Sequence, residues 1–280
     1  KPGSMNDAMR QPSPTESIVR RDFLRLLSFG SLACLLGLDQ ALSQSAGAQK
    51  TSPDFLRPGS KHYDQSRQLF NSRLNFRPAI IARCQSEKDI AAAVQHAHRH
   101  RMQVTVKSGG HSFEGFSSNN GGLMLNLSGM NRISYQQKSD LLRAQPGCRL
   151  ADVGELLFPK GRLLPSGSCA GVGVAGLTLG GGYGLFARKF GLTCDHLTGV
   201  RMIDGSGQIH DSDQQPDLLK ACRGGGNGNF GIISELRFRT VPAPKTFRSK
   251  RIRFRKLTPK RVADLCDLWF AATEKLPGDI

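Results

Sequence analysis

The chain has 280 residues, of which 38% are hydrophobic and 32 are glycine. This length accommodates one large domain or two small ones, and the composition is typical of a globular α and β protein with many loops. The formal net charge is +17, which favours an anionic partner. Because the N-terminus described next predicts export, we expect no nucleic acid. An anionic surface of the cell envelope, or simple solubility, is the better interpretation.

The N-terminus has the three parts of an export signal. Residues 19–25, VRRDFLR, match the twin-arginine pattern, residues 26–38 are apolar, and Ala46-Gly-Ala48 is a cleavage signal. The apolar stretch is too short to span a bilayer as a helix. An amphipathic helix or an uncleaved anchor is the alternative. We predict an N-terminal extension at 1–19, a signal peptide at 20–48 and a lead-in segment at 49–73, with delivery to the periplasm or exterior and no stable membrane span.

The elements that follow are short. Apolar runs and alternation predict strands, at residues 76–84, 103–107, 122–127, 141–144, 197–203 and 232–241. Helical patterns predict helices, at residues 86–101, 150–158 and 216–222. The first helix begins at a capping box formed by Ser86 and Asp89. Because strands outnumber helices and do not alternate with them regularly, the predicted class is α+β.

Beyond Pro242-Ala-Pro244 the composition changes, because residues 245–261 hold nine Lys or Arg and no acid. Within them Arg251 to Arg255 alternates with period two, which predicts a strand with a cationic, solvated face. Thr258-Pro259 then predicts the start of a helix. Its apolar stripe consists of Val262, Leu265, Trp269, Phe270 and Leu276. One strand and one helix cannot bury both apolar faces, so we expect residues 243–280 to be the start of a truncated substrate domain.

Seven cysteines occur, and none forms a C-x-x-C or zinc pattern. We predict buried free thiols rather than disulfides for those in apolar settings, at Cys84, Cys148, Cys194 and Cys222. His96 and His100 share a helix face in the run H-A-H-R-H, but no third ligand is evident. We interpret this run as a solvated helix end and predict no metal.

A glycine-rich turn follows the second predicted strand, in the sequence Val106-KSGGHSFEG. It places His111 where successive backbone N–H groups can form a concavity that binds phosphate. An ordinary turn with a surface histidine is the alternative interpretation of this motif alone.

A second glycine-rich segment, Pro165-SGSCAGVGVAGLTLGGGYG, contains Cys169. Eight glycines occur from Gly167 to Gly184. Glycine at this density indicates close backbone approach or torsions that other residues avoid. The two motifs together predict a cofactor site.

Two segments match the dinucleotide fingerprint G-x-G-x-x-G, at 171–176 and 226–231, and Asp195 lies 19 residues after the first. The fingerprint needs a buried strand before it and a long helix after it. Residues 164–169 are not a buried strand, and the second segment leads directly into the predicted strand at 232–241. We therefore expect no nicotinamide binding and, because no GK[ST] follows, no P-loop.

These motifs, with the segment RGGGNGNFG at 223–231, resemble the FAD-binding domain of the vanillyl-alcohol oxidase and p-cresol methylhydroxylase superfamily. The resemblance is greatest to its berberine-bridge-enzyme-like branch and covers residues 74–242. It implies two α+β subdomains that clasp FAD. It also implies a bicovalent cofactor, with His111 bonded to the 8α-methyl group of the isoalloxazine ring and Cys169 to its carbon C6.

The same resemblance assigns further cofactor-binding positions. They are Ser108, Gly109, Gly110, Ser112, Val172, Gly173, Gly176, Gly181, Gly182, Tyr183, Asn229, Phe230, Gly231, Ile232 and Ile233. Val172 occupies the position of an oxygen gate, where valine is more typical of oxidases than of dehydrogenases. The chain departs from the family at Ala170, where Pro is common, and at Asn227, where Gly is usual.

The resemblance implies an FAD-dependent oxidase that removes a hydride from a small-molecule substrate, an alcohol, sugar or amine, with oxygen as acceptor. The resemblance places the catalytic base in the substrate domain, and we assign no residue of this chain to that role. The alternative is a truncated, non-catalytic FAD-binding remnant or a basic module that binds the cell envelope. Reduction of the bound flavin by a candidate substrate distinguishes the two.

Overall fold

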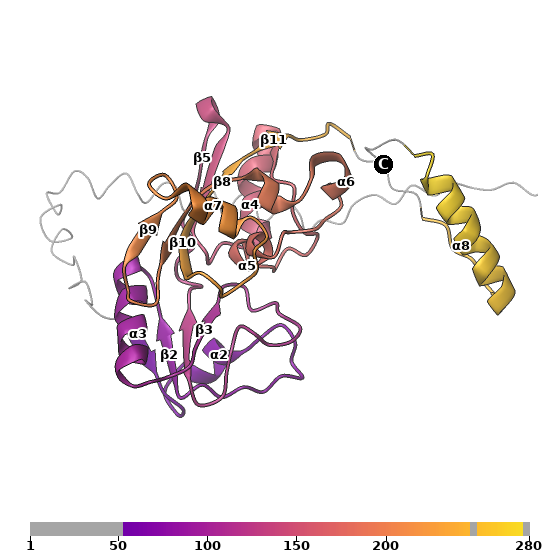
Figure 1. Ribbon diagram of the computed structural model, residues 1–280. Helices are drawn as coiled ribbons and strands as arrows, with labels where there is room; N and C mark the ends of the chain where they lie inside the picture. Colours follow the sequence, from indigo (N-terminus) through magenta and orange to yellow (C-terminus); the bar gives the residue numbers. More distant parts are fainter. Residues whose placement is uncertain (1–52, 247–250, 277–280) are drawn as a thin grey trace, which may run out of the picture. The chain divides into compact units, whose positions relative to one another are not determined.

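The computed structural model describes residues 53–246 and 251–276. The predicted N-terminal extension and signal peptide lie outside these residues. Among the residues described, no helix has both the length and the apolar character needed to cross a membrane. From residue 54 to residue 242 the chain forms two α+β halves in succession, each with its own sheet and core (Figure 1).

The first half is built on a four-stranded sheet in the order β1-β2-β4-β3. Its strands are β1 (Asp54–Leu56), β2 (Ile80–Arg83), β3 (Val104–Lys107) and β4 (Leu123–Asn126). β2, β4 and β3 are parallel, whereas β1 is antiparallel to β2. Helix α3 (Glu87–Arg99) makes the crossover from β2 towards β3 that parallel strands require (Figure 1). β1 and α2 (Tyr63–Arg67) lie within residues 49–73, so this lead-in segment contributes to the first half.

Helix α3 forms because its sequence supplies both a cap and an apolar face. The Ser86 hydroxyl accepts a hydrogen bond from the Asp89 amide (3.2 Å), and the Asp89 carboxylate accepts one from the Gln85 amide (2.9 Å). The apolar face shares one core with the sheet, and this core includes Ile90, Ala93, Val94, Ala97, Ile80, Ala82, Leu123 and Leu125. Full burial of one such aliphatic side chain stabilises the fold by roughly 1.5–3 kcal/mol.

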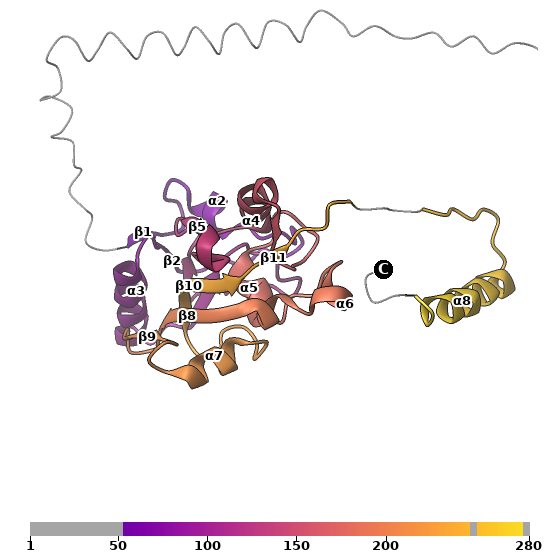
Figure 2. The same ribbon diagram turned by 90° about the horizontal axis from the view of Figure 1, so that it is seen from above.

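The second half is built on an antiparallel sheet in the order β5-β6-β10-β8-β9. Its strands are β5 (Ile133–Gln136), β6 (Leu141–Ala144), β8 (Leu197–Ile203), β9 (Ile209–Asp211) and β10 (Ile232–Arg239). Its helices are α4 (Leu150–Leu157), α5 (Val174–Leu179), α6 (Ala187–Phe190) and α7 (Pro216–Cys222), with 3-10 turns at Gln137–Ser139, Phe158–Lys160 and Thr193–His196. β7 (Arg162–Leu163) pairs with β11 (Val241–Pro242). Figure 2 shows α7 alongside β8, the strand that it contacts.

Polar and apolar contacts join the two halves. Glu87, at the start of α3, accepts two hydrogen bonds from the Arg201 guanidinium of β8, both 3.0 Å, and one from the Ser234 hydroxyl of β10 (2.7 Å). The hydrogen bond from Arg201 is the main reason that the pKa of Glu87 is lowered. Ile203 and Ile232, at the ends of the same two strands, are buried in the core of the first half. We call the group Glu87, Arg201 and Ser234 the latch.

The predicted α+β class is confirmed, but the predicted strand at Arg251 to Arg255 is wrong. These residues are exposed and have no regular structure, because alternation alone provides no partner for the backbone of a strand. The helix predicted after Thr258 is α8 (Pro259–Thr273), and the Thr258 hydroxyl caps it by accepting a hydrogen bond from the Arg261 amide (3.3 Å). Its apolar stripe is not buried, since Trp269 and Phe270 are both 64% exposed.

The predicted buried thiols are confirmed. Cys84, Cys148, Cys194 and Cys222 are buried and form no disulfide, whereas Cys169 and Cys266 are exposed.

In the histidine run, the rings of His96 and His100 stack with centroids 4.2 Å apart. The Nδ1 atom of His100 lies 2.8 Å from the His96 carbonyl oxygen, which turns it towards the helix backbone. Within the described part of the chain, no group of three or more His, Cys, Asp or Glu side chains is arranged to hold a metal.

Candidate cofactor site

The two glycine-rich motifs touch one another. The SGGHS turn follows β3 in the first half, and the Cys169 segment lies between β7 and α5 in the second. A Cβ atom added to Gly109 would overlap the Gly173 amide nitrogen and lie 2.8 Å from its Cα atom, and one added to Gly173 would lie 2.5 Å from the Gly109 amide nitrogen. Glycine is therefore needed at both positions for space, and the two backbones form a single junction.

His111 stands at this junction with its ring held on two sides. Phe70 stacks on the imidazole, with ring centroids 4.2 Å apart and an interplanar angle of 17°. The Nε2 atom lies 3.0 Å from the position that a Cβ of Gly171 would take. Burial lowers the pKa of His111 below its ordinary value, and the charge of Arg149 lowers it further. The imidazole is therefore neutral near pH 7 and keeps a nitrogen lone pair.

Lys107, the last residue of β3, fastens the start of the SGGHS turn to the end of α2. Its ammonium donates hydrogen bonds to the Ser66 and Gln68 carbonyls, at 2.8 and 2.5 Å, where a cation complements the free carbonyls of a helix C-terminus. Burial lowers the pKa of Lys107 to about 8, with a smaller effect from the charge of Arg149. The Lys107 ammonium is thus used to hold the turn against the end of α2.

The serines of the turn are also used within the protein. The Ser108 hydroxyl donates to the Pro146 carbonyl (2.5 Å), and the Ser112 hydroxyl accepts from the Phe116 amide (3.2 Å). Gly110 has a φ of 68°, in the left-handed region that favours glycine. The turn therefore presents its backbone to a ligand, with both hydroxyls holding the shape of the loop.

Cys169 is exposed on a turn that backbone hydrogen bonds hold in place. The Val172 amide donates to the Cys169 carbonyl (3.1 Å) and closes the turn. The Leu150 and Ala151 amides, at the start of α4, donate to the Val172 and Ala170 carbonyls, both at 3.0 Å. The free N–H groups at the start of a helix thus satisfy the carbonyls of the turn. Cys169 consequently has a fixed backbone and an accessible sulfur.

The remaining glycine-rich loops surround α5. Gly181 and Gly182, just after this helix, have φ values of 104° and 85°, which glycine adopts without strain. The Gly226 amide donates to the Leu179 carbonyl at the end of the helix (2.9 Å). The amide group of Asn227 lies close to the α5 glycines, with its oxygen 3.7 Å from the Cβ position of Gly176. Asn227 therefore packs over the helix.

Other predicted site residues have diverse surroundings. Tyr183 is 81% exposed and Phe230 45% exposed, and the Asn229 amide donates to the Gly225 carbonyl (2.9 Å). Ile232 and Ile233 have side chains buried in the cores of the first and second halves, so only their backbone can face a ligand. The structure brings residues 108–112 together with residues 169–173, and it brings the 226–227 segment to α5.

Three residues at the junction were not predicted. Phe70, Lys107 and Arg149 all act on His111 or its turn. Phe70 lies in the lead-in segment, and no local pattern connects it with the histidine. The sequence signal for Arg149 is its place directly before the predicted helix at 150–158. The structure adds that its backbone forms an isolated bridge with Gly173.

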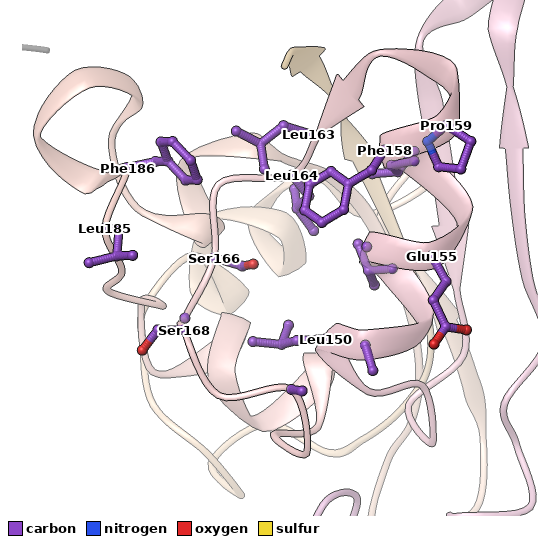
Figure 3. Close-up of a pocket in the computed structure, with 16 residues that line it drawn as sticks. Leu150, Glu155, Phe158, Pro159, Leu163, Leu164, Ser166, Ser168, Leu185 and Phe186 are labelled. Atoms are coloured by element: carbon purple, nitrogen blue, oxygen red, sulfur yellow. The ribbon is translucent and has the colours of Figure 1, made fainter. Parts of the chain in front are cut away.

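An apolar pocket of about 520 Å³ lies behind the Cys169 turn, between α4, β7 and residues 185–186 (Figure 3). Ser168 and Ala170 line it, whereas Cys169 between them does not. The Cys169 thiol is therefore not part of this pocket. The pocket and the junction that holds His111 and Cys169 are separate features.

The fold and the junction define a class of protein. Its two α+β halves meet where glycine backbones touch, and the loops that meet there carry His111 and Cys169. Residues 78–213 match the family described as FAD binding domain. The chain therefore contains an FAD-binding domain of the vanillyl-alcohol oxidase and p-cresol methylhydroxylase superfamily. The proteins that it is similar to include FAD-linked oxidases of this superfamily.

Particular relatives support this assignment. The chain is 40% identical over 186 residues to the uncharacterized FAD-linked oxidoreductase YgaK of Bacillus subtilis, covering 64% of this chain and 41% of that protein. It is 35% identical over 259 residues to glucooligosaccharide oxidase of Sarocladium strictum, covering 91% of this chain and 52% of that protein. The chain thus spans about half the length, or less, of these relatives.

A solved structure gives the same picture. Glucooligosaccharide oxidase from Acremonium strictum, studied for its 6-S-cysteinyl, 8α-N1-histidyl FAD, is 39% identical with a TM-score of 0.64. The match covers 69% of this chain and 41% of that one.

Proposed function

We propose that this chain provides the FAD-binding part of an FAD-dependent oxidase whose cofactor is bonded to both His111 and Cys169. The carrying observation is the loop contact, which brings His111 Nε2 to within 3.0 Å of a Gly171 Cβ position, two residues after Cys169. Two nucleophiles on adjoining loops can reach one ring system at two points. The cysteinyl and histidyl FAD of glucooligosaccharide oxidase supports this pairing.

The residues present fit FAD. The backbone N–H groups of the SGGHS turn can hold phosphate oxygens. Within residues 53–246 and 251–276, neither ring nitrogen of His111 has a hydrogen-bond partner, so one of them remains available for a covalent bond. Cys169 is exposed on the segment whose Gly171 and Gly173 lie against the SGGHS turn. The donor set therefore combines a phosphate-binding backbone with two groups that can bond to carbon.

When bound, FAD supplies the acceptor for a hydride. The chain's own residues would hold and orient it, with His111 and Cys169 as the two attachment points and the turn at 108–112 near its phosphates. We propose that Val172, which is half-buried beside Cys169 and packs on the second core, controls the approach of oxygen. The base that accepts the substrate proton would belong to the substrate domain.

We propose an alcohol or sugar as the substrate and oxygen as the final acceptor. The support is the similarity to glucooligosaccharide oxidase, together with valine at the position of the gate. Peroxide formed in proportion to oxidised sugar would support this. Turnover with artificial acceptors and no peroxide would contradict the role given to Val172.

We also propose export by the twin-arginine route, on the basis of residues 20–48. A cofactor that is covalently fixed cannot be lost after export, which agrees with such a route. The exposed cations Arg251, Arg253 and Arg255 support contact with an anionic envelope surface. Fractionation of cells that produce the protein with Arg20 and Arg21 replaced by Lys would show retention in the cytoplasm if the route is as proposed.

Covalent attachment is tested by denaturing the purified holo-protein in acid. The flavin colour should remain with the precipitated protein, and flavin in the supernatant would contradict attachment. His111→Ala and Cys169→Ala should each retain one bond, and the double variant should release all flavin. Loss of both bonds in one single variant would contradict two independent links.

A further inference from the structure

The ring of His111 is held in one orientation by Phe70 and Gly171, neither of which was predicted to be a site residue. Phe70 covers one face of the imidazole, nearly parallel at 17°. On the edge of the ring, a Cβ at Gly171 would meet Nε2 at 3.0 Å and Cε1 at 3.6 Å. Among the residues that the structure describes, no other atoms lie within 4 Å of that Cβ position apart from those of the neighbouring residues. The absence of a side chain at Gly171 therefore makes room for the imidazole.

The backbone at Gly171 does not itself require glycine. Its φ is not among the positive values, which include those of Gly110, Gly181 and Gly182. Torsion therefore explains glycine at those three positions. At Gly171 the reason is the space that the imidazole edge occupies.

Phe70 is fastened to the loop that carries His111 on both sides of the histidine. The Phe70 amide donates to the Gly110 carbonyl (3.0 Å), and the Asn71 side-chain amide donates to the Phe113 carbonyl (2.9 Å). The Phe113 ring also meets the Phe70 ring edge-on, with centroids 6.0 Å apart. Phe70 is nevertheless 57% exposed. Phe70 is therefore not a core residue. Its close, parallel contact is with the imidazole of His111.

We propose that Phe70 and Gly171 are positioning residues that orient the His111 imidazole for covalent attachment to FAD. This rests on the proposed function. Phe70 fixes the plane of the ring and Gly171 fixes its edge, which leaves Nδ1 as the nitrogen that is not directed at Gly171. Holding a nucleophile in one reactive orientation removes rotational freedom that would otherwise slow the bond-forming step.

The attachment balances with oxygen as the oxidant. A bond forms between an imidazole nitrogen and the 8α carbon, while one proton leaves the 8α-methyl group and one leaves the nitrogen. Two electrons remain to be removed, and dioxygen accepts them with the two protons to give hydrogen peroxide. The positioning residues take no part in this transfer and act only through the orientation of His111.

The test measures attachment at His111 alone, in a Cys169→Ala background. Full-length protein purified with incomplete flavin is incubated with FAD, and covalent flavin is followed over time by fluorescence after denaturing electrophoresis. Phe70→Ala and Gly171→Ala should each slow attachment about tenfold. Phe70→Tyr, which keeps the stacked ring, should attach at the parent rate. Phe116→Ala, a change of another exposed phenylalanine (77%, against 57% for Phe70) in the loop that carries His111, is the control and should also match the parent.

Non-covalent FAD affinity, measured on the same samples before attachment begins, separates positioning from structure. It should change less than threefold in Phe70→Ala, which is about half a log cycle or about 0.65 kcal/mol, because the residue acts on His111 and not on the rest of the cofactor site. Attachment at the parent rate in both Phe70→Ala and Gly171→Ala would overturn the proposal. If Phe70→Ala does not fold, Phe70→Leu and Gly171→Ala decide the matter. Failure of the proposed function looks different, because the unsubstituted protein would then bind no covalent flavin.

Discussion

His111 and Cys169 belong to the same junction, but the protein treats them differently. The His111 ring is partly buried, stacked on Phe70 and placed against Gly171, and its charge state is set by its surroundings. The Cys169 sulfur is exposed and only its backbone is fixed. The difference is that neighbouring groups hold the histidine ring, whereas at Cys169 only the backbone is held in place.

The largest effect should come from separating the two loops. Gly109→Val places a branched side chain where the Gly173 backbone lies. We expect a loss of about 3 kcal/mol in the free energy of unfolding, because an overpacked site must shift the backbone, and loss of both covalent bonds. Thermal unfolding and acid precipitation measure the two outcomes.

Gly205→Ala is the matched control for this prediction. A Cβ there meets nothing within 4 Å, and its φ is not positive. Its unfolding temperature and covalent flavin content should match the parent. Normal flavin attachment in Gly109→Val would show that the junction is not part of the site.

The exposed sulfur of Cys169 should react quickly with an alkylating reagent in flavin-free protein. Burial raises the pKa of Cys148 and Cys222 to about 11, which lowers their reactive thiolate by about a hundredfold relative to an ordinary thiol. Peptide mass mapping should therefore find Cys169 and the exposed Cys266 modified first. In holo-protein, only Cys169 should become protected. Equal protection of Cys266 would point to a general change in the fold instead.

Helices and strands could be predicted from the sequence where neighbouring residues determine them. The cap at Ser86 and the apolar face that follows it predicted α3, and buried apolar runs predicted the central strands. Helix α5 was missed, because glycines at 173, 176 and 180 weaken the helical signal. The strand predicted at Arg251 to Arg255 failed for a related reason, since alternation describes one strand and not the partner that it needs.

The site shows the same division. The motifs predicted that His111 and Cys169 belong together, because glycine-rich backbone around a reactive side chain indicates close approach. The stacking of Phe70 on His111 depends on how α2 and the segment after it return to β3, and no residue pattern records that contact. The latch is likewise invisible locally, because Glu87 and Arg201 belong to different halves.

Breaking the latch should lower the free energy of unfolding by less than Gly109→Val does. Glu87→Gln removes the charge that pairs with Arg201, and we expect a loss of about 2 kcal/mol in the free energy of unfolding, since hydrogen bonds to charged groups contribute roughly this much. The side chains are 27% and 37% exposed, so the loss stays below that of a fully buried pair. Because the pKa of Glu87 is lowered in the fold, this contribution is present above its ordinary pKa of 4.5 and is lost as the pH falls below it.

Chemical denaturation at neutral and acid pH measures this contribution. Asp54→Asn is the control, because it opens the pair with Arg83 in which both side chains are 43% exposed. Such a pair contributes less than about 1 kcal/mol. A Glu87→Gln variant as stable as the parent at neutral pH would contradict the role of the latch.

The smallest effect concerns the charge state of His111. Arg149→Gln removes a nearby cation that disfavours the imidazolium, so the pKa of His111 should rise, yet stay below its ordinary 6.5 because burial is the larger cause. A histidine with a lowered folded pKa contributes stability that is present above 6.5 and is lost as the pH falls towards the folded pKa. Arg149→Gln should narrow the pH range between the folded pKa of His111 and 6.5. Arg143→Gln is the control and should leave this range unchanged, because Arg143 pairs with Glu235. NMR titration of the imidazole in flavin-free protein measures both, and a pKa that falls in Arg149→Gln would show that this arginine does not act on the histidine.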